Sequence, residues 1–377
     1  MSTAIVESDQ GRAGRTRWDD VLDWSGSVRA IAVMRIAFGP ITLLHLRPFL
    51  RDASAGVSYH DHFWHPFIAW LPELPAGMWF ALLWAGAAAA VLMTIGLWTR
   101  LATVTAFAVV AGNLLLSETH FRHNRTFLAI VLGGLALLPA GRVLSVDAWW
   151  RRRAGDGTAP DVARLWPLWL LRAQVCLVYL ASGTSKLVDP DWFSGLVLWD
   201  RVVRYQHELG PLPGWASDLL IERWPYYIIG PAAVLTELLI GVGLWFGGRR
   251  RTVAIWVALC FHVLIEISAS VEVFSLAAIA ALCIWVTPST RERVIRVSQE
   301  DSNDRGVIAL VALVRAGDWF ARFRFEPAAA GAPRLTVVDR DGTSTTGAAA
   351  LAVVLSRLPL TFALAAPVRV LMERRRP

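Results

Sequence analysis

The sequence predicts an all-α polytopic membrane protein with about eight transmembrane helices and a small α/β appendage at the C-terminal end. Hydrophobic residues make up 55% of the 377 residues and charged residues only 18%, whereas soluble domains are about 25% charged. Several uniformly apolar runs reach the roughly 20 residues that a helix needs to cross a bilayer. Strands of a membrane barrel alternate apolar and polar residues instead, so these runs predict helices.

The apolar runs divide the chain into three expected parts. Residues 1–27 are polar, contain no cleavable signal peptide, and form a cytoplasmic segment. Residues 28–290 form the transmembrane domain, and residues 291–377 form a cytoplasmic tail. The predicted spans fall at about residues 28–50, 76–98, 101–117, 125–140, 164–187, 225–247, 252–270 and 271–288.

Arginines are concentrated in the links that eight spans place on one side of the membrane. These links carry Arg100, Arg142, Arg151–Arg153 and Arg249–Arg251, and positively charged links stay in the cytoplasm. We therefore expect both termini in the cytoplasm and the protein, multi-pass, in the inner (plasma) membrane of a bacterium. The clusters also account for the formal charge of +7 without nucleic acid as a partner, because the sequence has no basic stripe or recognition motif.

Two long external loops are expected, at residues 51–75 and 188–224. The first holds His60, His62 and His65, whose spacing suits a metal, but no carboxylate pattern accompanies them. We therefore favour an exposed loop and expect no metal cofactor. In the second loop, residues 194–206 have apolar residues at helical spacing, which predicts a helix lying over the bundle at the membrane surface.

Lys186 is the sharpest functional signal, because it is the one lysine in a chain with 36 arginines. It lies near the external end of the fifth predicted span. Arginine stays protonated, whereas a buried lysine loses its charge readily. A neutral amine can act as a general base. The plainer interpretation is a lysine that reaches from a helix end to the membrane surface, a task that arginine performs equally well.

Other ionisable residues lie within or beside the predicted spans, where charges are costly and need a partner or a cavity. His262 and Glu266 share a helix face and form either a proton relay or an ion pair. Arg35 or Arg172 can pair with Glu237 as structural support. The external link at residues 117–126 contains Asn124 and Arg125 near the same membrane face as Lys186, and it is either part of a site or a solvated loop.

Four segments resemble the HTTM family, the membrane domain shared with vitamin K-dependent gamma-carboxylase. The Lys186 segment is the most specific of the four. They are residues 34–39 (MRIAFG); 123–128 (HNRTFL) running on to 145–147 (SVD); 178–187 (VYLASGTSKL) with Asp191, Trp192 and Gly195; and Phe261-His262 with Phe274-Ser275.

The resemblance implies that Lys186 is the base that deprotonates a reduced quinone of the vitamin K or menaquinone type. In the carboxylase, oxygen then yields an epoxide and a strong base, glutamate loses a proton, and carbon dioxide adds. His262 matches a family histidine, and we add Glu266, Asn124, Arg125 and Arg35 as candidate residues of the cofactor site. Membrane lipid, the quinone and a secreted peptide or protein substrate are the implied partners.

The sequence departs from the carboxylase at Arg125, where the carboxylase has a histidine after the matching asparagine. An arginine cannot accept a proton, which argues against carboxylation. The expected reaction on the quinol is epoxidation or carboxylation-type chemistry. The alternative function is a non-enzymatic accessory factor that matures or handles a secreted peptide through the loops at residues 51–75 and 188–224. A transporter is a weaker hypothesis, because the sequence shows no inverted repeat.

The tail at about residues 305–377 resembles the later part of a DCC-type thiol-disulfide oxidoreductase domain. The stretch VVDRDGTSTTGAAALAVVLSRLP carries the likeness, with a turn signal at Asp341-Gly342. No cysteine follows Cys283, so the tail cannot exchange thiols itself. We expect a degenerate thioredoxin-like module. Further membrane helix at residues 351–372 is the alternative, and Arg357, Pro359 and Pro367 interrupt it.

Overall fold

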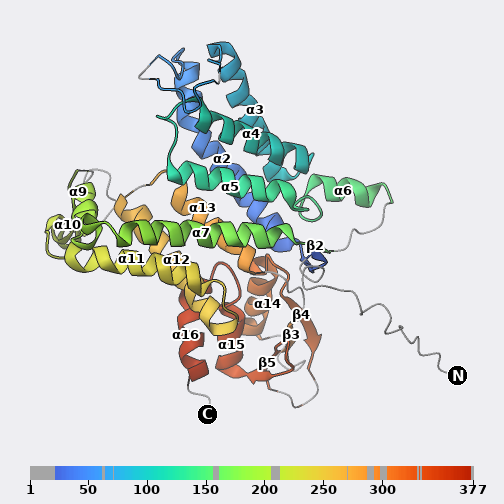
Figure 1. Ribbon diagram of the computed structural model, residues 1–377. Coiled ribbons are helices and arrows are strands. Elements are labelled where there is room, and N and C mark those ends of the chain that lie inside the picture. The colour runs from blue at the N-terminus through green and yellow to red at the C-terminus, as the bar shows by residue number, and fades with distance from the viewer. Residues whose placement is uncertain are drawn as a thin grey trace, which may run out of the picture.

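The structure is a computed structural model that describes residues 22–61, 64–70, 72–155, 161–204, 213–269, 271–286, 293–297, 304–328, 331 and 333–374. The predictions for most of the N-terminal segment (residues 1–21), for His62 and for residues 205–212 of the second external loop lie outside these ranges. Figure 1 shows a long helical bundle with a small sheet-containing unit beneath it.

The first half of the bundle is built around α2 (Arg29–Ser54), which packs along α3 (Ala76–Ile95). Next come α4 (Thr99–Leu116) and α5 (His123–Leu137), each packed on the helix before it. The short helix α6 (Val146–Arg153) begins at Ser145, whose hydroxyl accepts a hydrogen bond from the Ala148 amide. Strands β1 (Ser25–Ser27) and β2 (Val162–Arg164) pair antiparallel beside the start of α2.

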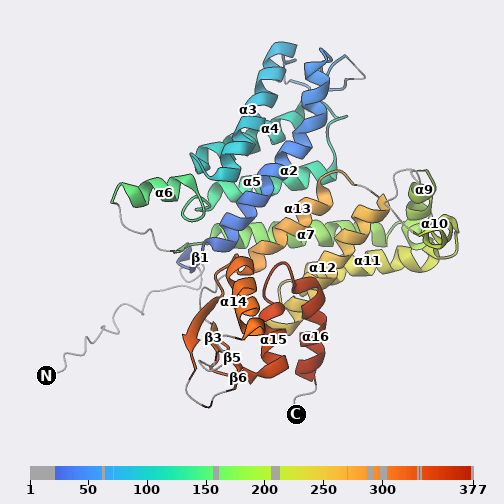
Figure 2. The same ribbon diagram turned by 180° about the vertical axis from the view of Figure 1, so that it is seen from behind.

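The second half consists of α7 (Pro167–Leu187), α11 (Tyr226–Gly243), α12 (Gly248–Ala269), and α13 (Phe274–Ala281) with the 3-10 turn η3 (Leu282–Trp285). Figures 1 and 2 show α7 and α11 running alongside each other. Small residues permit this approach, since a Cβ added at Gly183 lies 2.8 Å from Leu238 and one at Gly241 lies 2.8 Å from Leu180.

Three short helices gather at one end of α7 and α11: α8 (Pro190–Phe193), α9 (Leu196–Arg204) and α10 (Gly214–Ile221). Helix α9 confirms the helix predicted within residues 194–206. Its place at a membrane surface stays a prediction.

A helix lies in each of the eight predicted spans, but only four helices of the described chain are long and apolar enough to cross a membrane. These are α2, α3, α4 and α11. Helices α5, with 15 residues, and α13, with eight, are shorter than the roughly 20 residues that a full span requires. The structure therefore supports a membrane bundle of at least these four spans; eight crossings and the cytoplasmic position of both ends stay predictions.

Residues 293–374 form what we call the C-terminal module. Its four-stranded sheet has the order β4-β3-β5-β6, with β3 (Arg293–Val297) parallel to β4 (Phe323–Pro327) and antiparallel to β5 (Leu335–Val338), which pairs antiparallel with β6 (Ser344–Thr346). Helix α14 (Arg305–Gly317) connects the two parallel strands. This confirms the predicted small α/β appendage.

Two separate helices end the module: α15 (Gly347–Leu355) and α16 (Phe362–Arg374). The alternative of a membrane helix over residues 351–372 is therefore wrong, since the chain turns at the predicted interruption. The core of the module is apolar and includes Ile295, Val314, Val337, Val354 and Leu358. Helix α16 also packs against α12 of the bundle.

Candidate functional site

Lys186 forms an ion pair between α7 and α11. Its Nζ lies 2.6 Å from Oε1 of Glu237, and the side chains are 18% and 9% exposed. The ammonium also lies 4.5 Å from the ring centroid of Trp192, within the range of a cation–π contact. The lysine is thus enclosed by a carboxylate and an indole.

Two glycines allow the segment that contains Trp192 to lie close against α11. Gly195 has φ +67° and its added Cβ lies 2.0 Å from the carbonyl oxygen of Tyr226, while a Cβ at Gly230 lies 2.3 Å from the carbonyl oxygen of Trp192. Any side chain at either position collides with backbone, and the left-handed conformation of Gly195 favours glycine as well. This close approach is what brings Trp192 over the Lys186 ammonium.

A second polar pair lies on the same face of α7. Tyr179 is seven residues before Lys186, two helical turns or roughly 10 Å along the axis. Its hydroxyl lies 2.7 Å from Nε2 of His262 on α12, and both side chains are buried. Phe274 packs edge-on against the imidazole, with the ring centroids 5.4 Å apart.

Three buried polar atoms around these pairs have no hydrogen-bond partner within the described residues: Oε2 of Glu237, Nδ1 of His262 and Oγ of Ser275. Unsatisfied buried polar atoms are rare and mark places where a polar ligand or water belongs. A quinol carries hydroxyl groups that donate and accept hydrogen bonds and a ring that packs on aromatic side chains. The donor set and the aromatic surroundings therefore fit such a molecule.

A second cluster lies around Phe49 on the α2 side. Arg125 holds Glu272 through two hydrogen bonds of 3.0 and 2.8 Å, donates to the carbonyl oxygen of His120 at 3.0 Å, and lies 5.1 Å from the Phe49 ring centroid. His120 packs edge-on to the same ring at 5.0 Å, and His45 meets it from α2 at 5.7 Å.

Glu272 and His120, the members of the second cluster that lie outside the helices, both have a shifted pKa. Burial alone raises the pKa of Glu272, but the hydrogen bonds and charge of Arg125 outweigh it and lower the pKa below its ordinary value. Burial lowers the pKa of His120, and Arg125 acts in the same direction against a hydrogen bond to the Asn113 backbone. Glu272 is therefore held as a carboxylate and His120 as a neutral ring.

Phe274 connects the two clusters. It contacts His262 on one side and Phe127 of α5 on the other, with the Phe127 ring centroid 5.7 Å away, and Glu272 is two residues before it in the chain. Phe274 thus contacts the Tyr179–His262 pair and lies two residues from the Arg125–Glu272 pair in the chain.

The other predicted residues lie in different places. Arg35 donates hydrogen bonds to the backbone carbonyls of Met93, Thr94 and Leu144, near the start of α2. It is ten residues, or about 15 Å of helix, from His45. The Arg35–Glu237 ion pair that the sequence allowed is not formed, because Glu237 pairs with Lys186.

Arg172 likewise donates to backbone, binding the carbonyl oxygen of Ile284 at 2.7 Å. Glu266 is exposed, whereas His262, one turn earlier, is buried. The two residues therefore form neither the predicted proton relay nor the predicted ion pair. Asn124 is half-buried in the first turn of α5, directly before Arg125.

Tyr179 was not among the residues predicted for the site, and Glu237 pairs with Lys186 and not with the arginine that was expected. A spacing of seven residues from Lys186 was the available signal for Tyr179, since it places both on one helix face. No sequence signal identified the contact of Glu237, because it depends on how α11 lies against α7.

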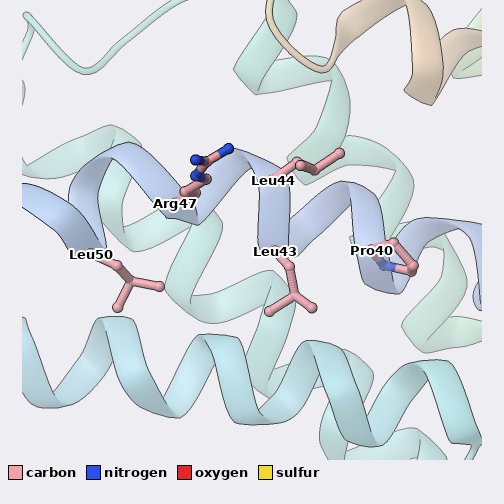
Figure 3. Close-up of a pocket in the computed structure, with 5 residues that line it drawn as sticks. All are labelled: Pro40, Leu43, Leu44, Arg47 and Leu50. Carbon is pink, nitrogen blue, oxygen red and sulfur yellow. The ribbon is translucent and has the colours of Figure 1, made fainter.

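A groove of 480 Å³ lies elsewhere, on α2, and is lined by Pro40, Leu43, Leu44, Arg47 and Leu50. Figure 3 shows Leu43 and Leu50 pointing to the neighbouring helix. The Lys186 pair is not part of it. Within the described residues, no group of three or more His, Cys, Asp or Glu side chains is arranged to bind a metal ion.

The family model of the HTTM domain matches residues 27–289, a range that includes both clusters and ends before the C-terminal module. No solved structure matches the chain.

Proposed function

The chain belongs to the HTTM domain family, membrane proteins of the gamma-carboxylase-like class, and from this premise we propose that it oxidises a lipid-soluble quinol. The Lys186–Glu237 pair is the proton acceptor of the proposed reaction. The quinol is of the vitamin K or menaquinone type and molecular oxygen is the oxidant. One oxygen atom enters the quinone epoxide, and the other leaves as water with the two quinol protons. The observation that carries the proposal is the 2.6 Å contact of the one lysine with a buried carboxylate.

The pair behaves chemically as one unit. Nζ of Lys186 and Oε1 of Glu237 lie within hydrogen-bond distance at 2.6 Å, so a proton can pass directly from one to the other. When a quinol hydroxyl gives its proton to Oε2 of Glu237, or to the amine after Glu237 has taken the lysine proton, the pair changes from neutral to singly positive. That charge stabilises the oxygen anion formed beside it, as oriented charges do in other active sites.

Other residues have supporting roles. The Tyr179 hydroxyl and the free nitrogen of His262 suit the second oxygen of a quinol ring, and Trp192 and Phe274 offer aromatic surfaces for it. The quinol supplies the electrons that reduce oxygen; the protein positions the ring, excludes water and accepts the proton. Arg125 is already engaged by Glu272, so we do not propose it as a proton acceptor.

The test is consumption of menaquinol by the purified protein in lipid nanodiscs under oxygen, with products followed by mass spectrometry. We expect Lys186→Met and Lys186→Arg to abolish turnover, because methionine removes the positive charge that stabilises the oxygen anion and arginine does not release a proton to Glu237. Ser185→Ala is the matched control, since this neighbouring side chain is exposed and bonds only to the Ser182 carbonyl. It should keep full activity.

Quinone that co-purifies with the protein separates binding from chemistry. Wild type and Lys186→Met should both retain it if the lysine acts in the reaction and not in binding. Full menaquinol turnover by Lys186→Met overturns the proposal. Absence of quinone from all variants, together with a peptide-processing defect on loop deletion, favours the accessory-factor alternative.

A further inference from the structure

Helix α16 presents an apolar stripe on its outer face. Leu364, Val368 and Leu371 are 82%, 51% and 59% exposed, and their spacing of four and three residues places them on one side of a helix. Leu360, in the preceding turn, is 67% exposed. Exposed apolar stripes of this kind are rare on surfaces that face water and mark a protein or membrane contact.

The opposite face of α16 attaches the C-terminal module to the bundle. Ala365 and Ala366 are buried, and the indole Nε1 of Trp256 on α12 donates a 2.8 Å hydrogen bond to the carbonyl oxygen of Ala363. Trp256 is eight residues, or about 12 Å of helix, from the start of α12. Helix α16 therefore begins beside a helix of the family-matched membrane domain, near the end of α12 that carries the basic link.

Positive charge lies in the basic link beside α16. Arg249, Arg250 and Arg251 lie in the first turn of α12, the helix against which α16 packs. An apolar stripe next to arginines is the pattern of helices that lie in the plane of an anionic membrane surface. Contact with lipid removes the exposed leucines from water, which a position in the aqueous phase does not.

We propose that α16 is an in-plane membrane anchor. Its stripe of Leu364, Val368 and Leu371 enters the leaflet on the side of the Arg249–Arg251 link, and arginines of that link contact the phosphates of anionic lipids. The occupant of the stripe is thus lipid, continuous with the lipid that surrounds α12. The inference depends on the membrane domain but not on the quinol chemistry.

Nitroxide labels measure the depth of this helix directly. The full-length protein, with Cys176, Cys260 and Cys283 changed to alanine and its melting temperature checked against wild type, carries one cysteine at Leu364→Cys or Leu371→Cys. It is placed in nanodiscs that contain phosphatidylglycerol. Ser344→Cys on the exposed edge strand β6 is the matched control in the same module.

We expect the labels at positions 364 and 371 to collide with oxygen several-fold more, relative to a water-soluble nickel complex, than the label at position 344. Equal nickel accessibility at all three positions overturns the proposal, because the stripe then faces water. Shielding of positions 364 and 371 from both reagents also overturns it, because the stripe then faces protein, such as a second copy of the chain. Neither outcome changes the expectation for menaquinol turnover.

Discussion

The Lys186 ammonium and the Glu237 carboxylate meet at 2.6 Å between α7 and α11, so the one lysine of the chain is a paired group inside the bundle. The sequence predicted a buried, neutral amine at this position. The proposed proton transfer from the quinol can use the pair in place of a neutral amine, because the Glu237 carboxylate can accept the lysine proton. Each side chain therefore neutralises the charge of the other.

Removal of one partner should cost more than removal of both. Lys186→Met leaves a buried carboxylate without its cation, and such a loss typically costs 3–5 kcal/mol, or roughly half of that for a partly exposed pair. We expect Lys186→Met with Glu237→Gln to recover part of the lost melting temperature in detergent. Additive losses in the double variant would show that the two side chains do not interact.

Tyr179→Phe tests the second pair. The variant keeps the ring but leaves Nε2 of His262 without its 2.7 Å partner, and loss of one hydrogen bond costs about 1 kcal/mol. We expect a modest fall in melting temperature and a fall in menaquinol turnover of about tenfold, the rate equivalent of about 1.4 kcal/mol. An unchanged turnover with lowered stability would assign the pair a purely structural role.

Gly195→Ala should disturb the position of Trp192. The alanine Cβ collides with the Tyr226 carbonyl oxygen and requires an unfavourable φ of +67°, which together should destabilise the protein by more than about 1 kcal/mol. Gly214→Ala is a matched control, because no atom lies within 4 Å of its added Cβ. Equal melting temperatures for the two variants would contradict the observed approach of Gly195 to α11.

The C-terminal module should lose stability in acid through Asp339. Burial acts to raise the pKa of this carboxylate, but Arg357, the Arg340 backbone amide and Arg293 together lower it below its ordinary value. Arg357 binds it at 2.6 Å and Arg293 at 3.0 Å. Because the folded pKa lies below the unfolded value of about 3.9, this stabilisation is complete above that pH and disappears as the pH falls through the folded pKa.

The measurement for Asp339 is unfolding of the full-length protein against pH, followed by tryptophan fluorescence. Wild type should lose stability below about pH 4, whereas Asp339→Asn should start lower and show a smaller acid dependence. Glu326→Gln is a control for surface charge in the same module, because this carboxylate is partly exposed and meets Arg296 and Arg324 at 3.4 and 3.3 Å. The same acid slope in wild type and Asp339→Asn would exclude the proposed contribution.

Composition and periodicity were sufficient for the coarse architecture. Apolar runs of about 20 residues exclude an ordinary water-soluble surface whatever the packing, so a helix was expected, and is found, in each of the eight ranges. The turn at Asp341-Gly342 and the short strand before it likewise gave the α/β character of the module. The helix lengths differ from the prediction, because α5 and α13 are shorter than the roughly 20 residues that a full span requires.

The residue sequence by itself determined the helical membrane fold and the family, and it identified Lys186 as the candidate base, because length, hydropathy and a unique residue are properties of the chain alone. Only the tertiary structure decided that Lys186 and not an arginine pairs with Glu237, that Tyr179 and His262 form a hydrogen bond, and that Glu266 is exposed. Such contacts depend on the rotation and separation of packed helices. The separation of α7 and α11 depends on glycines such as Gly183 and Gly241, which let the two helices approach closely. A linear pattern does not show which distant residue each glycine meets.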